Sequence, residues 1–548
     1  MRQRTLSRLV VFVGLLAAAA LPAAAQVVGS PGDPVYVVYP TGNYPADLEN
    51  VQLALGEVAS PGTVIMKSAA AGGGKLAFNF GGTNPGTGGV IVLNRPDITL
   101  TGDGWDRLLA EPRTSIVGGG GPHSFSPTVS GTGMVFAVKA PGVTIRELKL
   151  TTEYAYTGAF IVSTTARPAS DHPVVIERNH FTVINFGVIA SFTAAFPVRI
   201  DHNKFIGNAS IEARWMGFTL NPIASYPFDE PVVPRDASGR QVRHSVEITD
   251  NTVIKRPGST NWSTLTVYGW LNYGCPERSP ETACRRMRPD ANTPYVYQYG
   301  DGDNGPVFIS GNDITVSTPG VTVWTILLGS ESGGVNDVIL WRNKVTGVCS
   351  ETLVLGPYGH NNIIMDNDFS GVRAWTQAAI LAADTIVYGN SFGALDPIPP
   401  DKQQVPAGFL PPVLFLASAQ YYPAYTPVPN PVENCLIAKN DYRPSGAQSE
   451  AILMASRAEF LWARYGATGT EVMHNVVFES GGFPPGSGGA SRQVVEVDRL
   501  TNPTTGLAYV HDNRIVGMSS DGLDDPGIGD TIRMLHNLRK ALENRGSR

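Results

Sequence analysis

The chain repeats one short pattern of apolar residues around an asparagine ten times. In each repeat, one apolar residue lies three positions before the asparagine and another lies two positions after it. The asparagines are Asn179, Asn203, Asn251, Asn312, Asn343, Asn367, Asn390, Asn440, Asn475 and Asn513. By subtraction, successive members are 24, 48, 61, 31, 24, 23, 50, 35 and 38 residues apart, so several spacings are close to 24 or 48. A period of this length predicts a stacked, elongated architecture.

The apolar residues before each asparagine predict a β-strand. In the first five repeats a valine also lies five positions before the asparagine, at Val174, Val198, Val246, Val307 and Val338. Two apolar positions separated by one residue face the same side of a strand. We expect the asparagine to take a left-handed conformation in a tight bend, after which a second strand begins. Each repeat is therefore one coil, and the asparagine side chains should stack in a ladder.

This pattern resembles the right-handed parallel β-helix of the pectin-lyase-like superfamily over roughly residues 90–520. The resemblance implies an all-β fold, a single-stranded right-handed parallel β-helix solenoid with short N- and C-terminal capping helices. Two other repeat folds fit less well. A propeller blade needs about 40 residues or more, and a leucine-rich repeat needs several leucines per unit.

Apolar residues at helical spacing predict a helix near each end of the chain. The first runs from Ala46 to Val58, and the second from Thr531 to Asn544 with Asp530 as its N-cap. The second should cover the last coil, or else form a basic tail. The expected divisions are residues 1–25 as a signal peptide, 26–63 as a lead-in and capping helix, 64–520 as the β-helix, and 521–548 as the C-terminal helix or tail.

Residues 1–25 have the organisation of a secretory signal. Three arginines precede an apolar stretch from Leu9 to Leu21, and three alanines precede Gln26. The stretch is short for a membrane span, and no other segment has the length of one. We therefore expect a secreted protein, extracellular or periplasmic, without a membrane span and monomeric.

Composition and charge narrow the class further. Sixty glycines and 42 prolines with 16% charged residues indicate many turns and little helix. The formal net charge of −6 argues against a nucleic-acid partner. Four cysteines fit an oxidising compartment. We expect a disulfide between Cys275 and Cys284, and we expect Cys349 and Cys435 to be small core residues because their neighbours are apolar.

Three insertions interrupt the repeats, at about 207–240, 256–303 and 393–432, and the second is rich in aromatic residues and arginines. Aromatic faces stack on sugar rings, and arginine pairs with carboxylates or sulfates. The candidate substrate-binding residues are Trp262, Trp270, Tyr297, Tyr299, Arg285, Arg286 and Arg288. The alternative is that these aromatic residues pack the insertion onto the solenoid and that the arginines are a solvated rim.

Polar residues recur just ahead of the same predicted strand. His172, His244 and His360 each lie seven positions before a repeat asparagine, which places them on one rim of the solenoid. The candidate catalytic residues of this rim are His244, Asp301, Asp303, Glu331, Tyr358 and His360. They offer acid–base chemistry on a sugar, and their three carboxylates could instead hold a cation, for which calcium is the candidate. The alternative is that they are ordinary polar turn residues.

The local motifs do not identify the reaction. The segment Val198–Asn203 resembles the Trp-Ile-Asp-His segment of pectate lyases, with Arg199 in the tryptophan position. Tyr358–Asn361 partly matches the Gly-His-Gly element of polygalacturonases. The sequence therefore predicts a carbohydrate-active protein, lyase-like or hydrolase-like, that acts on an acidic polysaccharide. The alternative is a non-catalytic glycan-binding or adhesin-like scaffold.

Overall fold

The computed structural model describes residues 26–516 with gaps. The longest gaps are 215–243, 269–305, 397–413, 418–433, 443–460 and 479–494, and residues 1–25 and 517–548 also lie outside the described part. The expected signal peptide, the C-terminal helix, and Cys275 and Cys284 all fall on residues that are not described.

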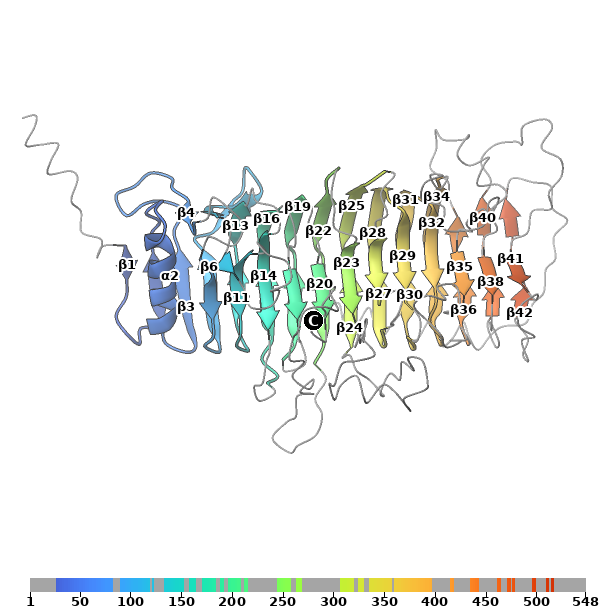
Figure 1. The fold of residues 1–548 in the computed structure, drawn as a ribbon, viewed down its shortest axis with the longest axis horizontal. Helices are drawn as coiled ribbons and strands as arrows, with labels where there is room; N and C mark the ends of the chain where they lie inside the picture. The colour runs from blue at the N-terminus through green and yellow to red at the C-terminus, as the bar shows by residue number, and fades with distance from the viewer. Residues whose placement is uncertain are drawn as a thin grey trace, which may run out of the picture.

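Three long sheets run the length of the molecule (Figure 1). Sheet 1 contains β1 (Val27–Val28), β2 (Val35–Val38), β3 (Gly62–Met66), β6 (Ile98–Gly102), β12 (Thr144–Arg146), β15 (Val174–Glu177), β18 (Val198–Asp201), β21 (Val246–Thr249), β24 (Val307–Ser310), β27 (Val338–Trp341), β30 (Ile363–Met365), β33 (Ile386–Tyr388), β36 (Leu436–Ala438), β39 (Glu471–Met473) and β42 (Tyr509–His511).

Sheet 2 contains β4 (Phe78–Asn79), β9 (Thr114–Val117), β13 (Leu148–Thr151), β16 (His180–Val183), β19 (Lys204–Gly207), β22 (Thr252–Lys255), β25 (Asp313–Ser317), β28 (Lys344–Val348), β31 (Asp368–Ala374), β34 (Ser391–Leu395), β37 (Asp441–Tyr442), β40 (Val476–Phe478) and β43 (Arg514–Val516). Beside it lies a small hairpin of β7 (Trp105–Asp106) and β8 (Glu111–Pro112).

Sheet 3 contains β5 (Ile91–Leu93), β10 (Gly121–Pro122), β11 (Gly133–Val138), β14 (Thr157–Ser163), β17 (Val188–Ser191), β20 (Ile211–Arg214), β23 (Ser263–Tyr268), β26 (Trp324–Leu328), β29 (Glu351–Leu355), β32 (Thr376–Ile380), β35 (Leu414–Ala417), β38 (Leu461–Arg464) and β41 (Val495–Asp498).

Each coil supplies one strand to each sheet in turn. β15, β16 and β17 form one coil, and they pair in parallel with β18, β19 and β20 of the next coil. Among the three long sheets, the described antiparallel pairs are β1–β2 and β10–β11. This topology is that of a parallel β-helix, and it confirms the predicted fold class.

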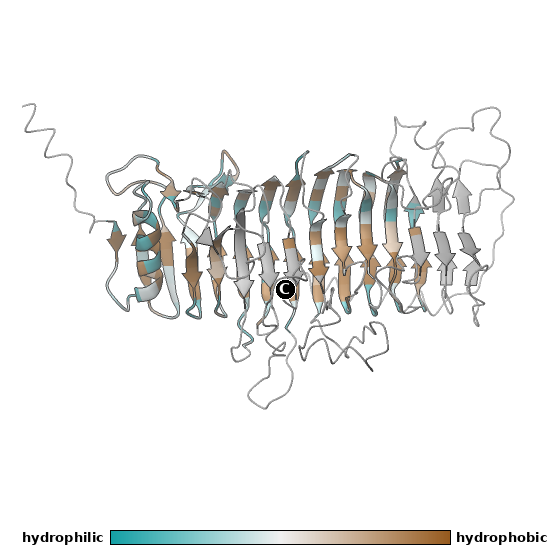
Figure 2. Cartoon of the chain, in the orientation of Figure 1, coloured by the Kyte–Doolittle hydropathy of each residue, from teal (hydrophilic) through white to brown (hydrophobic). Residues whose placement is uncertain are grey.

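The repeat residues lie opposite one another with the predicted register. Val174 of β15 pairs with Val198, which pairs with Val246 on the following coil. Ile176 pairs with Ile200 in the same way. All five side chains are buried in one continuous core. Buried and more exposed positions alternate along strands such as β15 and β18, and the ribbon carries both brown and teal residues (Figure 2).

The predicted asparagine ladder is present from Asn179 to Asn440. Each buried asparagine accepts, at its Oδ1, bonds from the backbone N–H and the Nδ2 of the preceding ladder asparagine. For example, Asn251 donates both bonds to Asn312 at 3.0 Å, and the Nδ2 of Asn312 donates to the Ile248 carbonyl at 2.9 Å. At the first position, where Leu148 replaces the asparagine, its backbone N–H donates to Asn179.

The prediction that the asparagine itself takes the left-handed conformation is wrong. The positive φ lies one residue earlier, for example 53° at Arg178, 51° at His202 and 52° at Asp250. The amide must stay inside to make its ladder bonds, so the residue before it turns the corner and points its side chain outward. Asn179 and the later ladder asparagines that the structure describes are absent from the positive-φ residues.

The predicted N-terminal helix is α2 (Ala46–Glu57). It lies at the N-terminal end of the sheets (Figure 1), and its Val51, Ala54 and Leu55 belong to the main core. Within the described ranges, no helix has the length and hydrophobicity that crossing a bilayer requires.

Two cysteines behave as the sequence predicts. Cys349 and Cys435 are free thiols buried in the core. Burial raises the pKa of the Cys349 thiol to about 12, so this side chain is an unreactive core residue.

Candidate functional site

The predicted catalytic residues all fall in connections from sheet 3 to sheet 1. His244 lies between β20 and β21, the two aspartates Asp301 and Asp303 between β23 and β24, and Glu331 between β26 and β27. Tyr358 and His360 lie between β29 and β30. We call this series of four successive connections the sheet 3–sheet 1 edge. By chain order, the six positions thus belong to connections between the same two sheets on four adjacent coils.

Two of the insertions also belong, by chain order, to connections between these two sheets. Residues 215–243 connect β20 to β21, and residues 269–305 connect β23 to β24 on the next coil. The predicted binding residues Trp262, Trp270, Tyr297, Tyr299, Arg285, Arg286 and Arg288 lie outside the described residues, as do Asp301, Asp303, Glu331 and Tyr358. Two of the six catalytic candidates, His244 and His360, are described.

His244 is buried at this edge. The residue is 6% exposed, and its Nε2 has no hydrogen-bond partner among the described residues. Burial lowers the pKa of the imidazole, and the nearby Asp171 opposes that shift. A neutral imidazole with a free nitrogen can accept a proton or coordinate a metal.

His360 is half-buried and held mainly through its backbone. Its N–H donates to the Oδ1 of Asn336 at 3.0 Å, and its carbonyl accepts from Asp337. A second amide, Asn362, accepts from the Val338 N–H at 3.1 Å. These bonds form a short amide stack that fixes the backbone of the edge near β27 and β30.

The three histidines of the predicted rim do not meet. Three strand spacings separate the coils of His244 and His360, which is about 14 Å. His172 lies two coils before His244, where its Nδ1 is 2.8 Å from Asp97 Oδ1. The histidines therefore share one edge of the solenoid without forming one constellation.

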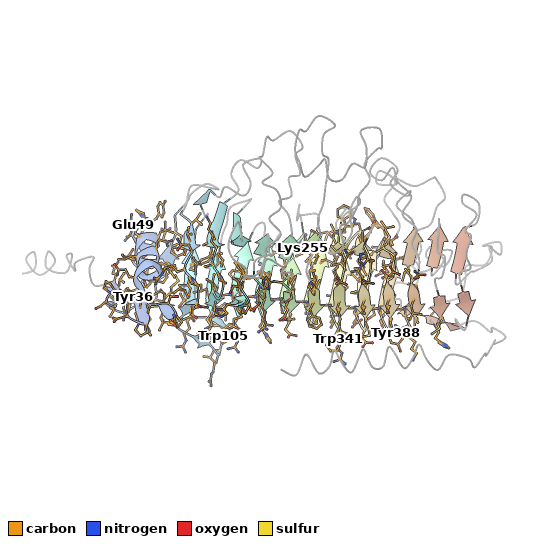
Figure 3. All side chains as sticks on the ribbon, turned by 90° about the horizontal axis from the view of Figure 1, so that it is seen from below. Tyr36, Glu49, Trp105, Lys255, Trp341 and Tyr388 are labelled. Atoms are coloured by element: carbon orange, nitrogen blue, oxygen red, sulfur yellow. The ribbon has the colours of Figure 1, made fainter. Side chains whose placement is uncertain are left out.

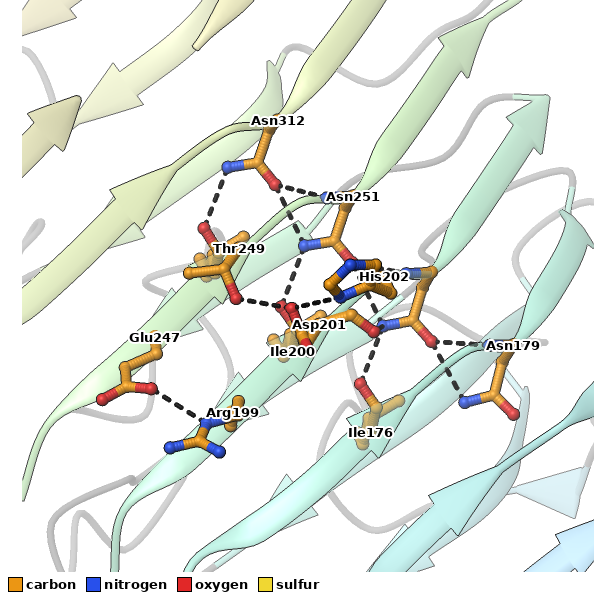
Figure 4. A network of polar contacts seen from close by, with 12 residues as sticks. Ile176, Asn179, Arg199, Ile200, Asp201, His202, Glu247, Thr249, Asn251 and Asn312 are labelled. Carbon is orange, nitrogen blue, oxygen red and sulfur yellow. Dashed lines mark hydrogen bonds and ion pairs between the residues drawn. The ribbon is translucent and has the colours of Figure 1, made fainter. Parts of the chain in front are cut away.

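A second polar group lies at the corner between sheets 1 and 2. Asp201, His202 and Asp250 offer ligand atoms that all lie within 4.8 Å of one another. His202 Nδ1 is 2.8 Å from Asp201 Oδ1, and the Thr249 hydroxyl donates to that same oxygen at 2.7 Å (Figure 4). Arg199 and Glu247 form an ion pair of 2.9 Å on the same face.

The corner residues point outward because they precede ladder asparagines. His202 comes directly before Asn203 and Asp250 directly before Asn251, so stacking of the ladder also stacks these two side chains. Burial raises the pKa of Asp250; His202 opposes that shift and Asp201 adds to it. Asp201 and His202 belong to the motif that resembles pectate lyases, whereas Asp250 was not predicted. The sequence feature that marks Asp250 is its position directly before a repeat asparagine.

The donor set at this corner suits some cations better than others. Calcium takes six to eight oxygen ligands, whereas imidazole favours zinc, copper, iron or nickel. Two carboxylates and an imidazole therefore fit a transition metal better than calcium. Asp201 already accepts a hydrogen bond from the Thr249 hydroxyl and pairs with His202. The three residues can therefore also form an ordinary surface network without a metal.

The comparisons with known proteins give distant structural similarities. No protein-family model and no curated protein matches the chain. A PL6 alginate lyase in complex with a trisaccharide has a TM-score of 0.46 at 9% identity, covering 91% of this chain and 88% of its own. A mutant DFA-IIIase from Arthrobacter chlorophenolicus has 0.45 at 12%, covering 90% and 99%.

A third solved structure is the A-module of a mannuronan C-5 epimerase from Azotobacter vinelandii, with a TM-score of 0.42 at 11% identity, covering 90% of this chain and 98% of that one. By its own three parallel sheets, the chain is a parallel β-helix protein.

Proposed function

We propose that this protein is a secreted, monomeric carbohydrate-active β-helix protein that acts on an acidic polysaccharide at the sheet 3–sheet 1 edge. The observation that supports it most is His244, a buried imidazole whose Nε2 has no partner in the described part of the chain and whose pKa is lowered. A buried donor or acceptor left unpaired costs stability, and perturbed groups of this kind concentrate at functional sites.

The residues at the edge suit two reactions. In a lyase reaction, His244 would remove the proton next to a uronate carboxylate, while Arg285, Arg286 and Arg288 neutralise that carboxylate. In a hydrolase reaction, two of the carboxylates Asp301, Asp303 and Glu331 would flank the glycosidic bond. Tyr358 and His360 would then bind or protonate the sugar. Aromatic stacking on Trp262, Trp270, Tyr297 and Tyr299 would orient the chain in either case.

A bound cation would supply charge neutralisation at the same edge. Asp301, Asp303 and Glu331 provide the oxygen donors that calcium prefers, unlike the mixed set at Asp201, His202 and Asp250. We therefore place the proposed calcium ion at the edge and not at the corner.

An activity screen tests the proposal. Purified mature protein is incubated with pectate, alginate, glycosaminoglycans and neutral glucans, with calcium or with a chelator. Absorbance from unsaturated ends identifies a lyase, and reducing ends without absorbance identify a hydrolase. We expect H244Q to lose at least about 100-fold in rate on an acidic substrate, the scale of general acid–base catalysis. The matched control H172Q, at an exposed position on the same edge, keeps the rate. Equal rates in both variants would exclude His244 as the base.

One observation favours the second function, a non-catalytic glycan-binding scaffold. The coils of His244 and His360 are three strand spacings, about 14 Å, apart along the solenoid, which places the two imidazoles too far apart to act on one bond. This reading predicts retarded migration in gels that contain an acidic polysaccharide, with no product from any substrate. Product formation by the wild type that H244Q abolishes would rule it out.

A further inference from the structure

The small hairpin beside sheet 2 ends in an exposed apolar turn. Its strands β7 and β8 pair antiparallel, so residues 107–110 form the turn between them. Leu108 is 97% exposed and Leu109 is 63% exposed. In the described part of the chain, the exposed large hydrophobic residues all lie between residues 28 and 117, and Leu108 is the most exposed of them. Single exposed leucines are common on protein surfaces, but two adjacent ones at the end of a turn are a candidate contact surface.

The turn is ordered from within, and the hairpin is anchored at its base. The Oδ1 of Asp106 accepts hydrogen bonds from the N–H groups of Leu108 at 3.0 Å and Leu109 at 3.2 Å. Trp105 packs edge-on against His180 of β16, with 5.3 Å between the ring centroids. Trp105 lies at the lower margin of the ribbon, in its N-terminal half (Figure 3). The hairpin therefore presents its leucines to solvent from a fixed base on the outer face of sheet 2.

Three cations surround the turn. Arg107 belongs to the turn itself, Arg113 follows β8 directly, and Lys75 comes from the preceding coil; all three are exposed. Hydrogen bonds from two backbone N–H groups lower the pKa of Asp106, and the positive charges of Lys75 and Arg113 add to that effect. Both cations therefore lie close to the base of the turn.

The acidic side chains of this region are bound by donors inside the loops. Asp106 accepts the two backbone bonds of the turn. Glu111 of β8 accepts from Lys149 Nζ at 2.8 Å with both oxygens. Asp103, just before β7, accepts from the Ser68 hydroxyl at 2.9 Å. The exposed charge around the two leucines is therefore positive, although the chain as a whole has a formal net charge of −6.

We propose that this turn binds the surface of an anionic phospholipid bilayer, with Leu108 and Leu109 inserted among the headgroups and Lys75, Arg107 and Arg113 close to the lipid phosphates. Aliphatic side chains gain free energy when they leave water for the acyl boundary. Basic residues near an anionic leaflet add electrostatic attraction. The two contributions act together here because the cations flank the leucines.

The size and chemistry of the turn favour a bilayer over other partners. A stable protein interface buries about 800 Å² on each partner, far more than two leucines supply. A bilayer accepts a small convex apolar tip without a complementary shape. Sugar rings stack on aromatic faces, and residues 107–110 contain no aromatic residue. Membrane binding here is independent of the proposed function, because β7 and β8 lie several coils before His244.

Vesicle flotation tests the proposal. Purified mature protein is mixed with vesicles of phosphatidylcholine alone or of phosphatidylcholine with phosphatidylglycerol. We expect flotation with the mixed vesicles and none with phosphatidylcholine alone. L108S/L109S should lower the partition coefficient at least about tenfold through lost apolar burial, and R107Q/R113Q at least about tenfold through lost attraction. The matched control L53S, at an exposed leucine of α2, should bind as the wild type does.

Four results would overturn the proposal. They are no flotation with the mixed vesicles, equal flotation with both kinds of vesicle, wild-type binding by L108S/L109S, and an equal loss of binding in L53S. Sedimentation velocity without lipid examines a second copy of the chain as the partner: a wild-type dimer that L108S/L109S converts to a monomer would also overturn it. The thermal midpoint of each variant should match the wild type because the replaced side chains are exposed. If L108S/L109S lowers that midpoint, R107Q/R113Q decides by the same criteria.

Discussion

Each ladder asparagine stabilises two coils at once. Its Oδ1 accepts two bonds from the asparagine of the coil before, and its Nδ2 donates to a carbonyl of that coil. These groups are buried, so the loss of one side chain leaves several polar atoms without partners. This dependence explains why the asparagine recurs in nearly every coil, and why Leu148 is tolerated at the start, where its N–H still has an acceptor.

The first prediction concerns a single rung. N312A removes the acceptor of Asn251 and the donor to Ile248. We expect it to lower the free energy of unfolding by about 2–4 kcal/mol, the sum of one to two unsatisfied buried groups. Guanidinium unfolding measures the change. D313A, at the exposed neighbouring residue, should change stability by less than about 0.5 kcal/mol, and an equal loss in both variants would contradict the ladder account.

The second prediction concerns pH. Burial, with Lys204 and Lys149, lowers the pKa of His180 to about 4, against the opposing effect of Glu111. The unfolded chain therefore binds a proton more readily, so stability falls as pH drops from about 6.5 to about 4. His244 adds a loss of the same sign. H180Q should flatten the fall of the thermal midpoint across this window. A profile that keeps the wild-type slope would show that His180 does not titrate there.

At the scale of the element, the corner between sheets 1 and 2 decides how coils stack. One residue per coil takes a positive φ there, and its side chain lies against the equivalent residue of the next coil. Asp250 and Gly311 form one such pair, in which Gly311 has a φ of 66°. A Cβ at Gly311 would lie closer to Asp250 Oδ1 than van der Waals contact allows. The glycine thus makes room for the carboxylate.

The third prediction follows from that pair. G311A adds both a strained φ and an atomic overlap, so we expect a loss of at least about 1–2 kcal/mol in the free energy of unfolding. G56A is the matched control, because Gly56 lies in α2 with open space around its Cβ position. It should raise stability by about 0.5–1 kcal/mol. Similar losses in both variants would refute the corner argument.

At the scale of the whole molecule, the coils contact mainly their neighbours, as the pairing of each strand with the strands one coil away shows. A solenoid of this kind unfolds as a chain of coupled units and not as one block. A destabilising substitution in one coil should therefore affect mainly that coil and its neighbours.

The fourth prediction tests that locality. I248A removes a buried side chain between Ile200 and Ile309, at a cost of about 2–5 kcal/mol. Hydrogen exchange read by mass spectrometry should show lost protection over residues 198–316 and unchanged protection over 35–66. Uniform loss along the chain would indicate a single cooperative unit.

Much of the fold was predictable because an asparagine has to recur at the same corner of successive coils. An apolar residue three before and two after an asparagine determines which faces are inside, and Val174 and Ile176 pair as that pattern predicts. The left-handed conformation was predicted one residue too late, at the asparagine. Sequence spacing alone does not show whether the buried asparagine or the residue before it takes the positive φ.

The sequence by itself determined the period, the inward faces and the ladder, because these depend on local alternation and a short repeat. Tertiary structure alone decided two other features. It buried His244 with no partner for its Nε2 among the described residues, and it brought Asp250 against Asp201 and His202, which lie 49 and 48 residues earlier in the sequence. Each depends on which coils become neighbours after insertions of unequal length, and a repeat pattern does not encode that choice.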